Sequence, residues 1–197
     1  MKVYILRHGQ TDANKKYLLQ GRSDLPLNDT GILQAREAGE GFRRLGITFT
    51  KVYSSPLQRA VQTAQYAAEG IPVKTDDRLL EMDYGPYEGT DLRSMPEEVI
   101  AFFRDFVNTP APPGMEQLRD VTARLGTFLE ELKKTAPEGN ILLSTHAIAL
   151  KGALEYLMPE AEGKWWSTNI GNCAVFVTEL TEDGYTEPQE VILQKGE

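Results

Sequence analysis

Short apolar runs alternate with longer helical segments along this chain of 197 residues, and this alternation restricts the fold more than any other feature. Four brief runs have the length of buried strands: residues 2–6, 51–53, 72–74 and 141–144. Five longer segments carry helical spacing of apolar residues or helix-cap signals: residues 28–45, 55–70, 96–107, 115–134 and 147–157. Repeated strand–helix alternation predicts an α/β fold, a three-layer sandwich with a mostly parallel central sheet and helices on both faces.

Cap signals and turn residues place several of the boundaries. Ser55 followed by Pro56 is a candidate start for the second long helix, with the serine as its N-cap. Near the end of the chain, residues 173–180 and 190–194 read as two strands, and a turn through residues 183–184 lies between them. We expect these two strands to form an antiparallel hairpin at the end of the sheet.

Composition and charge exclude several classes of partner. The net charge is −8, and an acidic surface argues against nucleic acid or an anionic membrane as the main partner. No apolar run approaches the roughly 18 residues that span a membrane, and the first run is too short for a signal peptide. The single cysteine, Cys173, excludes an intrachain disulfide and is expected in a core strand. We therefore expect a cytoplasmic protein of one domain, residues 1–197, with a helical insertion at about 91–135.

Both histidines of the chain and two of its arginines follow predicted strands. Arg7 and His8 end the first strand. His146 follows the last buried run, and Arg59 lies just beyond the second strand. Because ligands of open α/β sheets bind at the carboxyl ends of the strands, we expect these side chains to meet at one edge. Arginine binds phosphate through bidentate hydrogen bonds, and a helix start near Ser55 would add N–H groups, so the pattern points to a phosphate pocket.

For His8, the residues alone leave three readings: a loop histidine, a metal ligand or a nucleophile. A metal site would need carboxylates or a third histidine at ligand spacing, and no HxH, HxxxH or CxxC pattern occurs. A serine nucleophile has weak support because G-x-S-x-G is absent. We therefore expect no metal and no cofactor. Two nearby guanidinium charges should lower the pKa of His8 and keep it neutral and nucleophilic.

Five segments of the chain together carry a family resemblance. They are LRHGQTDAN, LQGRSDLPLNDTGILQA, VYSSPLQRAVQTA, LLEMDYGPYEG and LLSTHA. In order and spacing they resemble the phosphoglycerate-mutase-like branch of the histidine phosphatase superfamily, from residue 2 to about residue 156. The resemblance implies the phosphoglycerate-mutase-like fold. Within the family, it implies the small phosphatase type of α-ribazole phosphatase and the broad-specificity phosphatases.

The resemblance also implies roles for individual residues. His8 corresponds to the nucleophile that becomes phosphohistidine, and Glu81 to the residue that protonates the leaving oxygen and then activates water. The residues expected to contact the phosphoryl group or other substrate oxygens are Arg7, Asn14, Gln20, Gly21, Arg59, His146 and Ala147. Two positions depart from the family pattern: Ala147 stands where glycine is frequent, and Tyr87 where many relatives have tryptophan.

The implied activity is metal-independent hydrolysis of a small phosphorylated metabolite. Glycolytic mutases of the family are longer, with extra segments that close the pocket, and this difference favours a phosphatase. The alternatives are a phosphoglycerate mutase dependent on 2,3-bisphosphoglycerate and a non-catalytic, phosphate-binding regulatory domain. Substrate specificity is expected to reside in residues 76–91, 94–114 and 163–172. An edge strand or the apolar helices are candidate contact surfaces for a homodimer.

Overall fold

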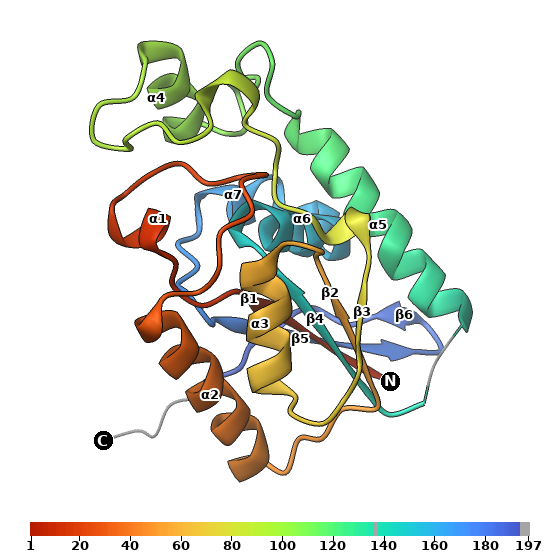
Figure 1. Cartoon of the computed structure of the whole chain (residues 1–197). Helices are drawn as coiled ribbons and strands as arrows, with labels where there is room; N and C mark the ends of the chain where they lie inside the picture. Colours follow the sequence, from red (N-terminus) through yellow and green to blue (C-terminus); the bar gives the residue numbers. More distant parts are fainter. Residues whose placement is uncertain (136–137, 194–197) are drawn as a thin grey trace.

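A computed structural model describes residues 1–135 and 138–193 of the chain. In this part, the strands form one seven-stranded sheet in the order β3-β2-β4-β1-β5-β6, with β7 paired to β5 (Figure 1). The strands are β1 (Lys2–Arg7), β2 (Lys51–Ser54), β3 (Val73–Thr75), β4 (Asn140–Thr145), β5 (Val175–Thr181), β6 (Gly184–Tyr185) and β7 (Gln189–Glu190). The strands β1 to β4 pair in parallel, whereas β5, β6 and β7 pair in antiparallel fashion. The mostly parallel sheet predicted from the sequence is therefore confirmed.

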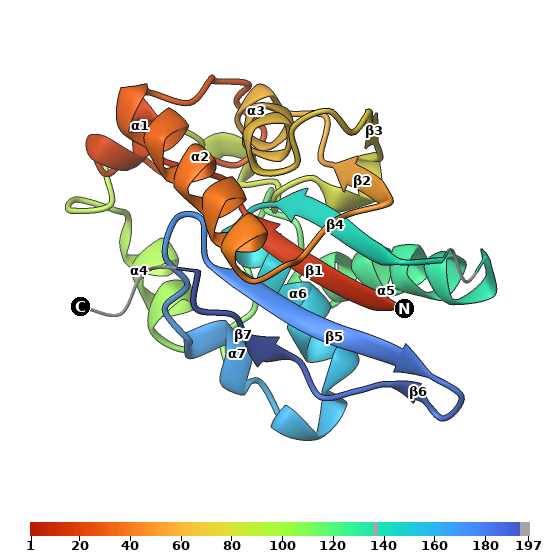
Figure 2. The ribbon, with the colours of Figure 1, turned by 90° about the horizontal axis from the view of Figure 1, so that it is seen from below.

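Helices cover both faces of the sheet and bury its central strands (Figures 1 and 2). Helices α2 (Asp29–Arg44) and α3 (Gln58–Ala67) lie on one face, and α5 (Leu118–Thr135) and α6 (Ala147–Leu157) on the other. Alternate residues of β1 divide between the two layers, because successive side chains of a strand point to opposite faces. Val3 and Ile5 pack with α5 and α6, and Tyr4 and Leu6 pack with α2 and α3. The predicted three-layer sandwich is confirmed.

Two helices begin later than the sequence signals predict. Helix α3 begins at Gln58, with Leu57 and not Ser55 as its N-cap. The Ser55 hydroxyl accepts from the Leu57 N–H (3.3 Å) and also contacts a histidine side chain, described below, so it closes a turn just before the helix and does not cap it. Helix α5 begins at residue 118 rather than 115, because the Met115 N–H closes a turn with a preceding carbonyl.

The last strands and the fourth helix also differ from the prediction. Strand β5 begins at Val175, because Cys173 has a φ of 56°, in the left-handed region that ends an extended run. The prediction of a core strand position for Cys173 is therefore wrong. The turn at Asp183 joins β5 to β6, whereas β7 pairs with β5 separately. Gln194, the end of the predicted last strand, lies outside the described residues. Helix α4 (Glu97–Arg104) ends at residue 104 rather than 107.

A cap, residues 92–117, lies beyond the carboxyl ends of the parallel strands and contains α4 (Figure 1). It is tied to the N-terminal loop at its first residue: Leu18 forms a bridge with Asp91, and the Leu92 N–H donates to the Tyr17 carbonyl (2.8 Å). The remaining short helices are α1 (Asp12–Lys15), η1 (Asp77–Leu79), η2 (Gly85–Tyr87), η3 (Pro159–Ala161) and α7 (Lys164–Ser167). None of the described helices has the length and apolar character needed to cross a membrane.

Candidate active site

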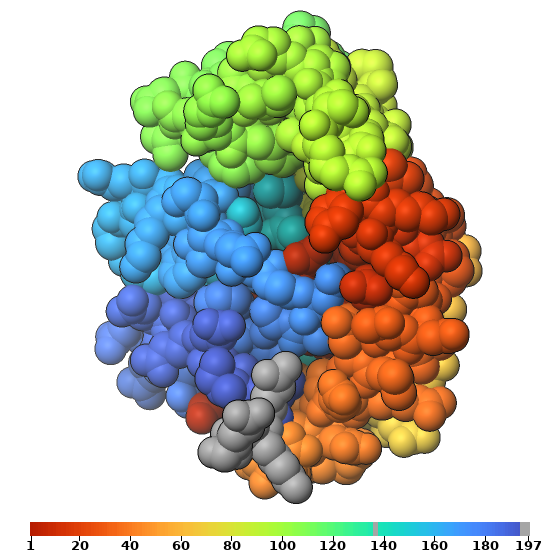
Figure 3. Space-filling model, turned by 90° about the vertical axis from the view of Figure 1, so that its left-hand side faces the viewer, coloured from red at the N-terminus to blue at the C-terminus, as the bar shows by residue number. Residues whose placement is uncertain are grey.

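The carboxyl ends of β1 and β4 bring the two histidines together. In the parallel register, Arg7 of β1 lies opposite Thr145 of β4, so the residues that follow them are also neighbours. The ring centroids of His8 and His146 lie 5.1 Å apart. Figure 3 shows a hollow on this side of the molecule, between the cap and the segments below it, with the teal β4–α6 region at its base. The cluster thus lies at the edge where the strand rule predicts it.

His8 is buried, with 4% of its surface exposed. Its Nδ1 lies 2.6 Å from the carbonyl oxygen of Gly9. A carbonyl only accepts, so Nδ1 carries the proton and Nε2 has the free lone pair. Burial, together with the charges of Arg59 and Arg7, lowers the pKa of His8 well below 6.5. His8 is therefore a neutral imidazole whose unprotonated nitrogen can act as a nucleophile.

The backbone after His8 is held against the start of α2. A Cβ on Gly9 would lie 2.5 Å from the Gly31 carbonyl oxygen, and one on Gly31 would overlap the Gln10 carbonyl oxygen. Asn28 caps α2 by accepting from the Gly31 N–H (2.9 Å), and its own N–H donates to the Gln10 carbonyl (3.0 Å). The two backbones pack with no side chain between them, which fixes the loop that carries His8.

Arg59, on the first turn of α3, is fully buried. Its guanidinium donates to the carbonyls of Gly21 and Ser23 (2.6 Å each), and its Nε donates to Nδ1 of His146 (3.2 Å). No carboxylate in the described part of the chain forms an ion pair with it. Burial lowers the pKa of Arg59 to about 10, so the group stays charged at neutral pH. A buried cation without a paired carboxylate is costly, and this arrangement suits the binding of an anion.

His146 is fully buried between Arg59 and Ser55. Arginine has no acceptor, so Nδ1 of His146 must accept, and the proton lies on Nε2, 2.8 Å from the Ser55 hydroxyl oxygen. Burial and the Arg59 charge lower the pKa of His146 well below 6.5. The imidazole is consequently neutral and is held at both nitrogens.

Arg7 and Gln20 carry donors that find no acceptor in the part of the chain that the structure describes. A terminal nitrogen of Arg7 donates to the Ile170 carbonyl, whereas its buried Nε has no partner among the described residues. The same holds for the buried Nε2 of Gln20, whose Oε1 accepts from the Thr11 hydroxyl (2.8 Å). Buried donors in proteins are nearly always paired, so these two suit an acceptor supplied by a ligand.

Glu81 lies beneath the start of α6 and is buried, with 3% of its surface exposed. Its carboxylate accepts from the backbone N–H groups of Ile148 (3.1 Å) and Ala149 (2.9 Å). On the other side, Arg124 of α5 donates to two carbonyls of the segment just before Glu81 (2.6 and 2.8 Å). Because α6 follows directly on His146, these bonds place the carboxylate at the same edge of the sheet as both histidines.

The other expected contact residues lie around this cluster. Asn14, in α1, accepts from the Thr11 N–H (3.1 Å) and lies next to Asn172, whose amide donates to the His8 carbonyl (3.0 Å). Ala147 begins α6 with an ordinary helical backbone, so alanine fits at this position without the strain of a positive φ. The structure thus brings all the predicted site residues to one edge of the sheet.

This geometry has a counterpart in a known family, because the model of the histidine phosphatase superfamily (branch 1) matches residues 3–189. The chain belongs to the histidine phosphatase superfamily. The family resemblance predicted from the five sequence segments is therefore confirmed.

Among the relatives of this superfamily member, the putative phosphoserine phosphatase 2 of Hydrogenobacter thermophilus is 30% identical over 188 residues, which cover 93% of this chain and 90% of that protein. A probable phosphoglycerate mutase, GpmB, of Salmonella paratyphi B is 36% identical over 155 residues, which cover 76% of this chain and 71% of that one. Among solved structures, the mycobacterial glucosyl-3-phosphoglycerate phosphatase in complex with VO3 is similar with a TM-score of 0.82 and 28% identity, covering 97% of both chains.

In this histidine phosphatase superfamily member, Glu88 belongs to the site, although neither the residue pattern nor the family resemblance gave this residue a role. Its carboxylate accepts from the backbone N–H groups of Gly21 (2.8 Å) and Ser23 (3.0 Å) and from the Ser23 hydroxyl. The carbonyls of the same two residues accept from Arg59. Glu88 therefore positions Arg59 through the backbone of residues 21–23. The GPYEG segment contains this glutamate, but nothing local to it shows which loop it binds.

The anion site predicted at the start of α3 is wrong. The Gln58 N–H, at the first position of that helix, donates to the Asp24 carboxylate (2.6 Å), and the Ser55 hydroxyl binds His146. The helix start that reaches the site is that of α6, and its N–H groups hold Glu81. Within residues 1–135 and 138–193, no group of three or more His, Cys, Asp or Glu side chains is placed to hold a metal ion.

Proposed function

We propose that this protein is a metal-independent phosphomonoesterase that hydrolyses a small phosphorylated metabolite through a phosphohistidine on His8. The tautomer of His8 carries the proposal: its Nδ1–H bonds to the Gly9 carbonyl, so the lone pair of Nε2 is free to attack phosphorus. Arg7 and Arg59 lie nearby as cations without an ion-paired carboxylate in the described residues. Phosphoryl transfer depends mainly on positioning and charge neutralisation, and these side chains supply both.

The reaction proceeds in two steps. His8 Nε2 attacks phosphorus and the bond from phosphorus to the leaving oxygen breaks, while Glu81 gives a proton to that oxygen. Arg7 and Arg59 hold the phosphoryl oxygens, and His146 keeps the Arg59 side chain in place through its bond to Nε. The Nδ1–H bond to a carbonyl stabilises the positive charge that develops on the His8 imidazole. Water then attacks the phosphohistidine and gives a proton to Glu81. The bond from phosphorus to nitrogen breaks, inorganic phosphate leaves, and both residues return to their starting states.

The relatives support two candidate reactions. The names of the phosphoserine phosphatase and the glucosyl-3-phosphoglycerate phosphatase support hydrolysis of a small phosphorylated metabolite. The similarity to a probable phosphoglycerate mutase supports a second candidate, a mutase dependent on 2,3-bisphosphoglycerate. The short cap, whose helix is the eight-residue α4, supports the phosphatase, because water must reach the phosphohistidine.

Rapid-quench labelling with p-nitrophenyl [32P]phosphate tests the proposal. Wild-type protein should form an acid-labile, alkali-stable phosphoenzyme that His8→Ala lacks, and a chelator should leave turnover intact. Full activity in His8→Ala would refute the mechanism. Formation of 2-phosphoglycerate from 3-phosphoglycerate, stimulated by 2,3-bisphosphoglycerate, would favour the mutase. A protein that binds phosphorylated metabolites but turns over none of a broad panel would instead be a regulatory domain.

We further propose that residues 1–197 act as a single catalytic domain in the cytoplasm, with a helical insertion at about 91–135 of which the cap lies over the site and α5 covers one face of the sheet. The net charge of −8 and the single, half-buried Cys173 support a reducing environment and a small, soluble substrate. The position of α4 beyond the strand ends supports a role for the insertion in substrate selection.

A further inference from the structure

Helix α6 carries a cation that the proposed mechanism does not use. Lys151 lies one turn after Ala147, and its side chain is half-buried. Its Nζ donates to the Trp166 carbonyl of α7 (2.8 Å) and lies 5.5 Å from the centre of the Phe106 ring in the cap. Lys151 therefore lies among α6, α7 and the cap, which all border the hollow seen in Figure 3.

Lys151 has no ion-pair partner in the described part of the chain. The Trp166 carbonyl occupies a single N–H of the ammonium. The charged groups that act on it are Glu81, which attracts it, and Arg7, which repels it, and both belong to the site. Burial lowers the pKa of Lys151 to about 8, so the ammonium is still largely charged at neutral pH.

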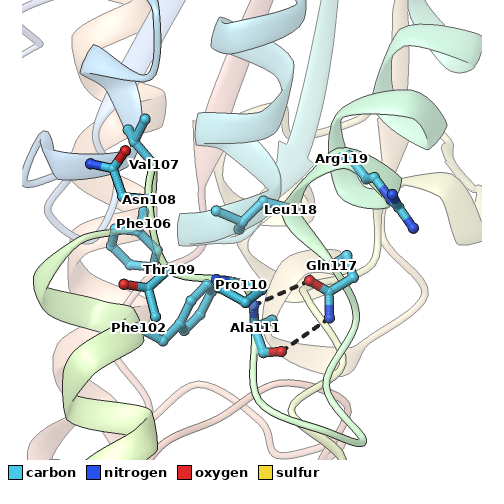
Figure 4. Close-up of a pocket in the computed structure, with 10 residues that line it drawn as sticks. All are labelled: Phe102, Phe106, Val107, Asn108, Thr109, Pro110, Ala111, Gln117, Leu118 and Arg119. Atoms are coloured by element: carbon cyan, nitrogen blue, oxygen red, sulfur yellow. Dashed lines mark hydrogen bonds between the residues drawn. The ribbon is translucent and has the colours of Figure 1, made fainter.

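The Phe106 ring connects Lys151 to a pocket in the cap. The pocket has a volume of about 640 Å³ and lies between α4 and the start of α5 (Figure 4). Leu118 adds to its apolar wall, and Gln117 closes one side through two hydrogen bonds with Ala111 (3.1 Å each). The lining is mixed, with polar side chains beside the apolar ones, and Phe106 is the part of it that lies next to the ammonium. The ring keeps water from that side of the ammonium and so strengthens its attraction for an anion.

If Lys151 only tethered α6 to α7, its bond to the Trp166 carbonyl would be sufficient. A neutral side chain could donate that bond without the free-energy cost of burying a charge. We propose that Lys151 binds a second anionic group of the substrate, a carboxylate, while the phosphoryl group lies at His8. This inference rests on the proposed function and narrows its substrate class to phosphomonoesters of carboxylic acids. Lys151 is then the residue that distinguishes these from neutral phosphomonoesters.

A matched pair of substrates tests the role of Lys151. The compounds 3-phosphoglycerate and glycerol 3-phosphate differ only by a carboxylate in place of a hydroxymethyl group. Lys151→Met keeps the length of the side chain and should lower kcat/KM for 3-phosphoglycerate about 10- to 100-fold, mainly through KM. It should change kcat/KM for glycerol 3-phosphate by less than about 3-fold. Lys151→Arg should restore most of the loss, and Lys133→Met, on the exposed face of α5, should match the wild type.

Equal losses for the two substrates in Lys151→Met would overturn the inference and leave Lys151 as a tether. Measurements of ligand binding distinguish a failure of the carboxylate site from a failure of the proposed function. Titration calorimetry of the His8→Ala protein should show tighter binding of 3-phosphoglycerate than of glycerol 3-phosphate, and Lys151→Met should remove the difference. Selective binding without turnover of any phosphomonoester would refute the proposed function alone. Turnover of p-nitrophenyl phosphate without selective binding would refute the carboxylate site alone.

The pH dependence gives an independent readout. The preference for 3-phosphoglycerate should decline as the pH rises through about 8, because the ammonium of Lys151 loses its proton under the combined influence of burial, Glu81 and Arg7. Glycerol 3-phosphate corrects for titration of the rest of the site. Lys151→Arg should keep the preference at high pH, and the same decline in that variant would contradict the assignment.

Discussion

Replacing Glu88 should loosen Arg59 without removing any group proposed to contact the substrate. The Glu88 carboxylate accepts from the Gly21 and Ser23 N–H groups and from the Ser23 hydroxyl, while the carbonyls of those residues accept from Arg59. Hydrogen bonds to charged groups contribute about 1.5–3 kcal/mol each. Because Glu88 is half-buried, water replaces part of what is lost, and Glu88→Ala should lower the unfolding free energy by about 2–3 kcal/mol.

The effect of Glu88 on turnover should exceed what lost stability explains. A displacement of about 1 Å in a positioned group costs on the order of 100-fold in rate, so kcat/KM for p-nitrophenyl phosphate should fall about 100-fold in Glu88→Ala, at a temperature where the variant is fully folded. Glu88→Gln keeps one acceptor oxygen and should lie between Glu88→Ala and the wild type. Glu69→Gln, at an exposed position beyond α3, is the matched control and should change neither quantity.

A double-mutant cycle decides whether Glu88 acts through Arg59. If it does, adding Glu88→Ala to an Arg59→Ala protein should cost little further kcat/KM, because the group that Glu88 positions is already absent. Additive losses would refute the reasoning. So would a Glu88→Ala protein with normal kcat/KM and a lowered urea midpoint, since Glu88 would then only stabilise its loop. Urea unfolding followed by tryptophan fluorescence measures the midpoint, and steady-state kinetics measure the rest.

Two further predictions concern the loop and the histidines. Gly31→Ala should lower the unfolding free energy by about 3 kcal/mol, because its Cβ would overlap the Gln10 carbonyl oxygen. Gly171→Ala is the control, because its Cβ would meet nothing within 4 Å. Equal urea midpoints for the two variants would contradict the packing argument. Between pH 6.5 and 5, the unfolding free energy should fall by up to about 1.4 kcal/mol per pH unit for each of His8 and His146, because both stay neutral in the fold while the unfolded chain takes up protons. As the pH falls from 6.5 to 5, the urea midpoint should decrease less steeply in His8→Asn than in the wild type. A wild-type midpoint that stays constant over this range would show that the two histidines are not held neutral in the fold.

The meeting of Arg7, His8 and His146 could be predicted from the sequence because parallel strands end at a common edge, however their side chains pack. The role of Ser55 could not. A serine before a proline is a local signal for a helix cap, but a histidine 91 positions away in the sequence holds its hydroxyl. Glu88 is a similar case, because its partners lie 65 to 67 positions earlier. Contacts of this kind depend on how loops far apart in the sequence pack together in the fold, and local sequence patterns do not predict that packing.

The start of α5 shows the same limit for secondary structure. The apolar spacing continues back to residue 115, yet the helix begins at residue 118. Glu116 bonds to Arg124 (2.7 Å) and accepts from the Asp83 N–H (3.1 Å), and its own N–H donates to the Asp83 carbonyl (2.8 Å). These contacts with the loop that follows Glu81 outweigh the local helical preference, because they satisfy a backbone pair and a charge together.

The bridge between Leu18 and Asp91 joins the cap to the stretch of chain that leads to Gly21 and Ser23. Outward movement of the cap, to admit a substrate or to let phosphate escape, would pull on this stretch and on the Arg59 guanidinium that it holds. A cap movement that widened access to the site would therefore also shift the backbone that holds the Arg59 guanidinium, so the entry of a ligand and the position of Arg59 would be coupled through residues 18–23.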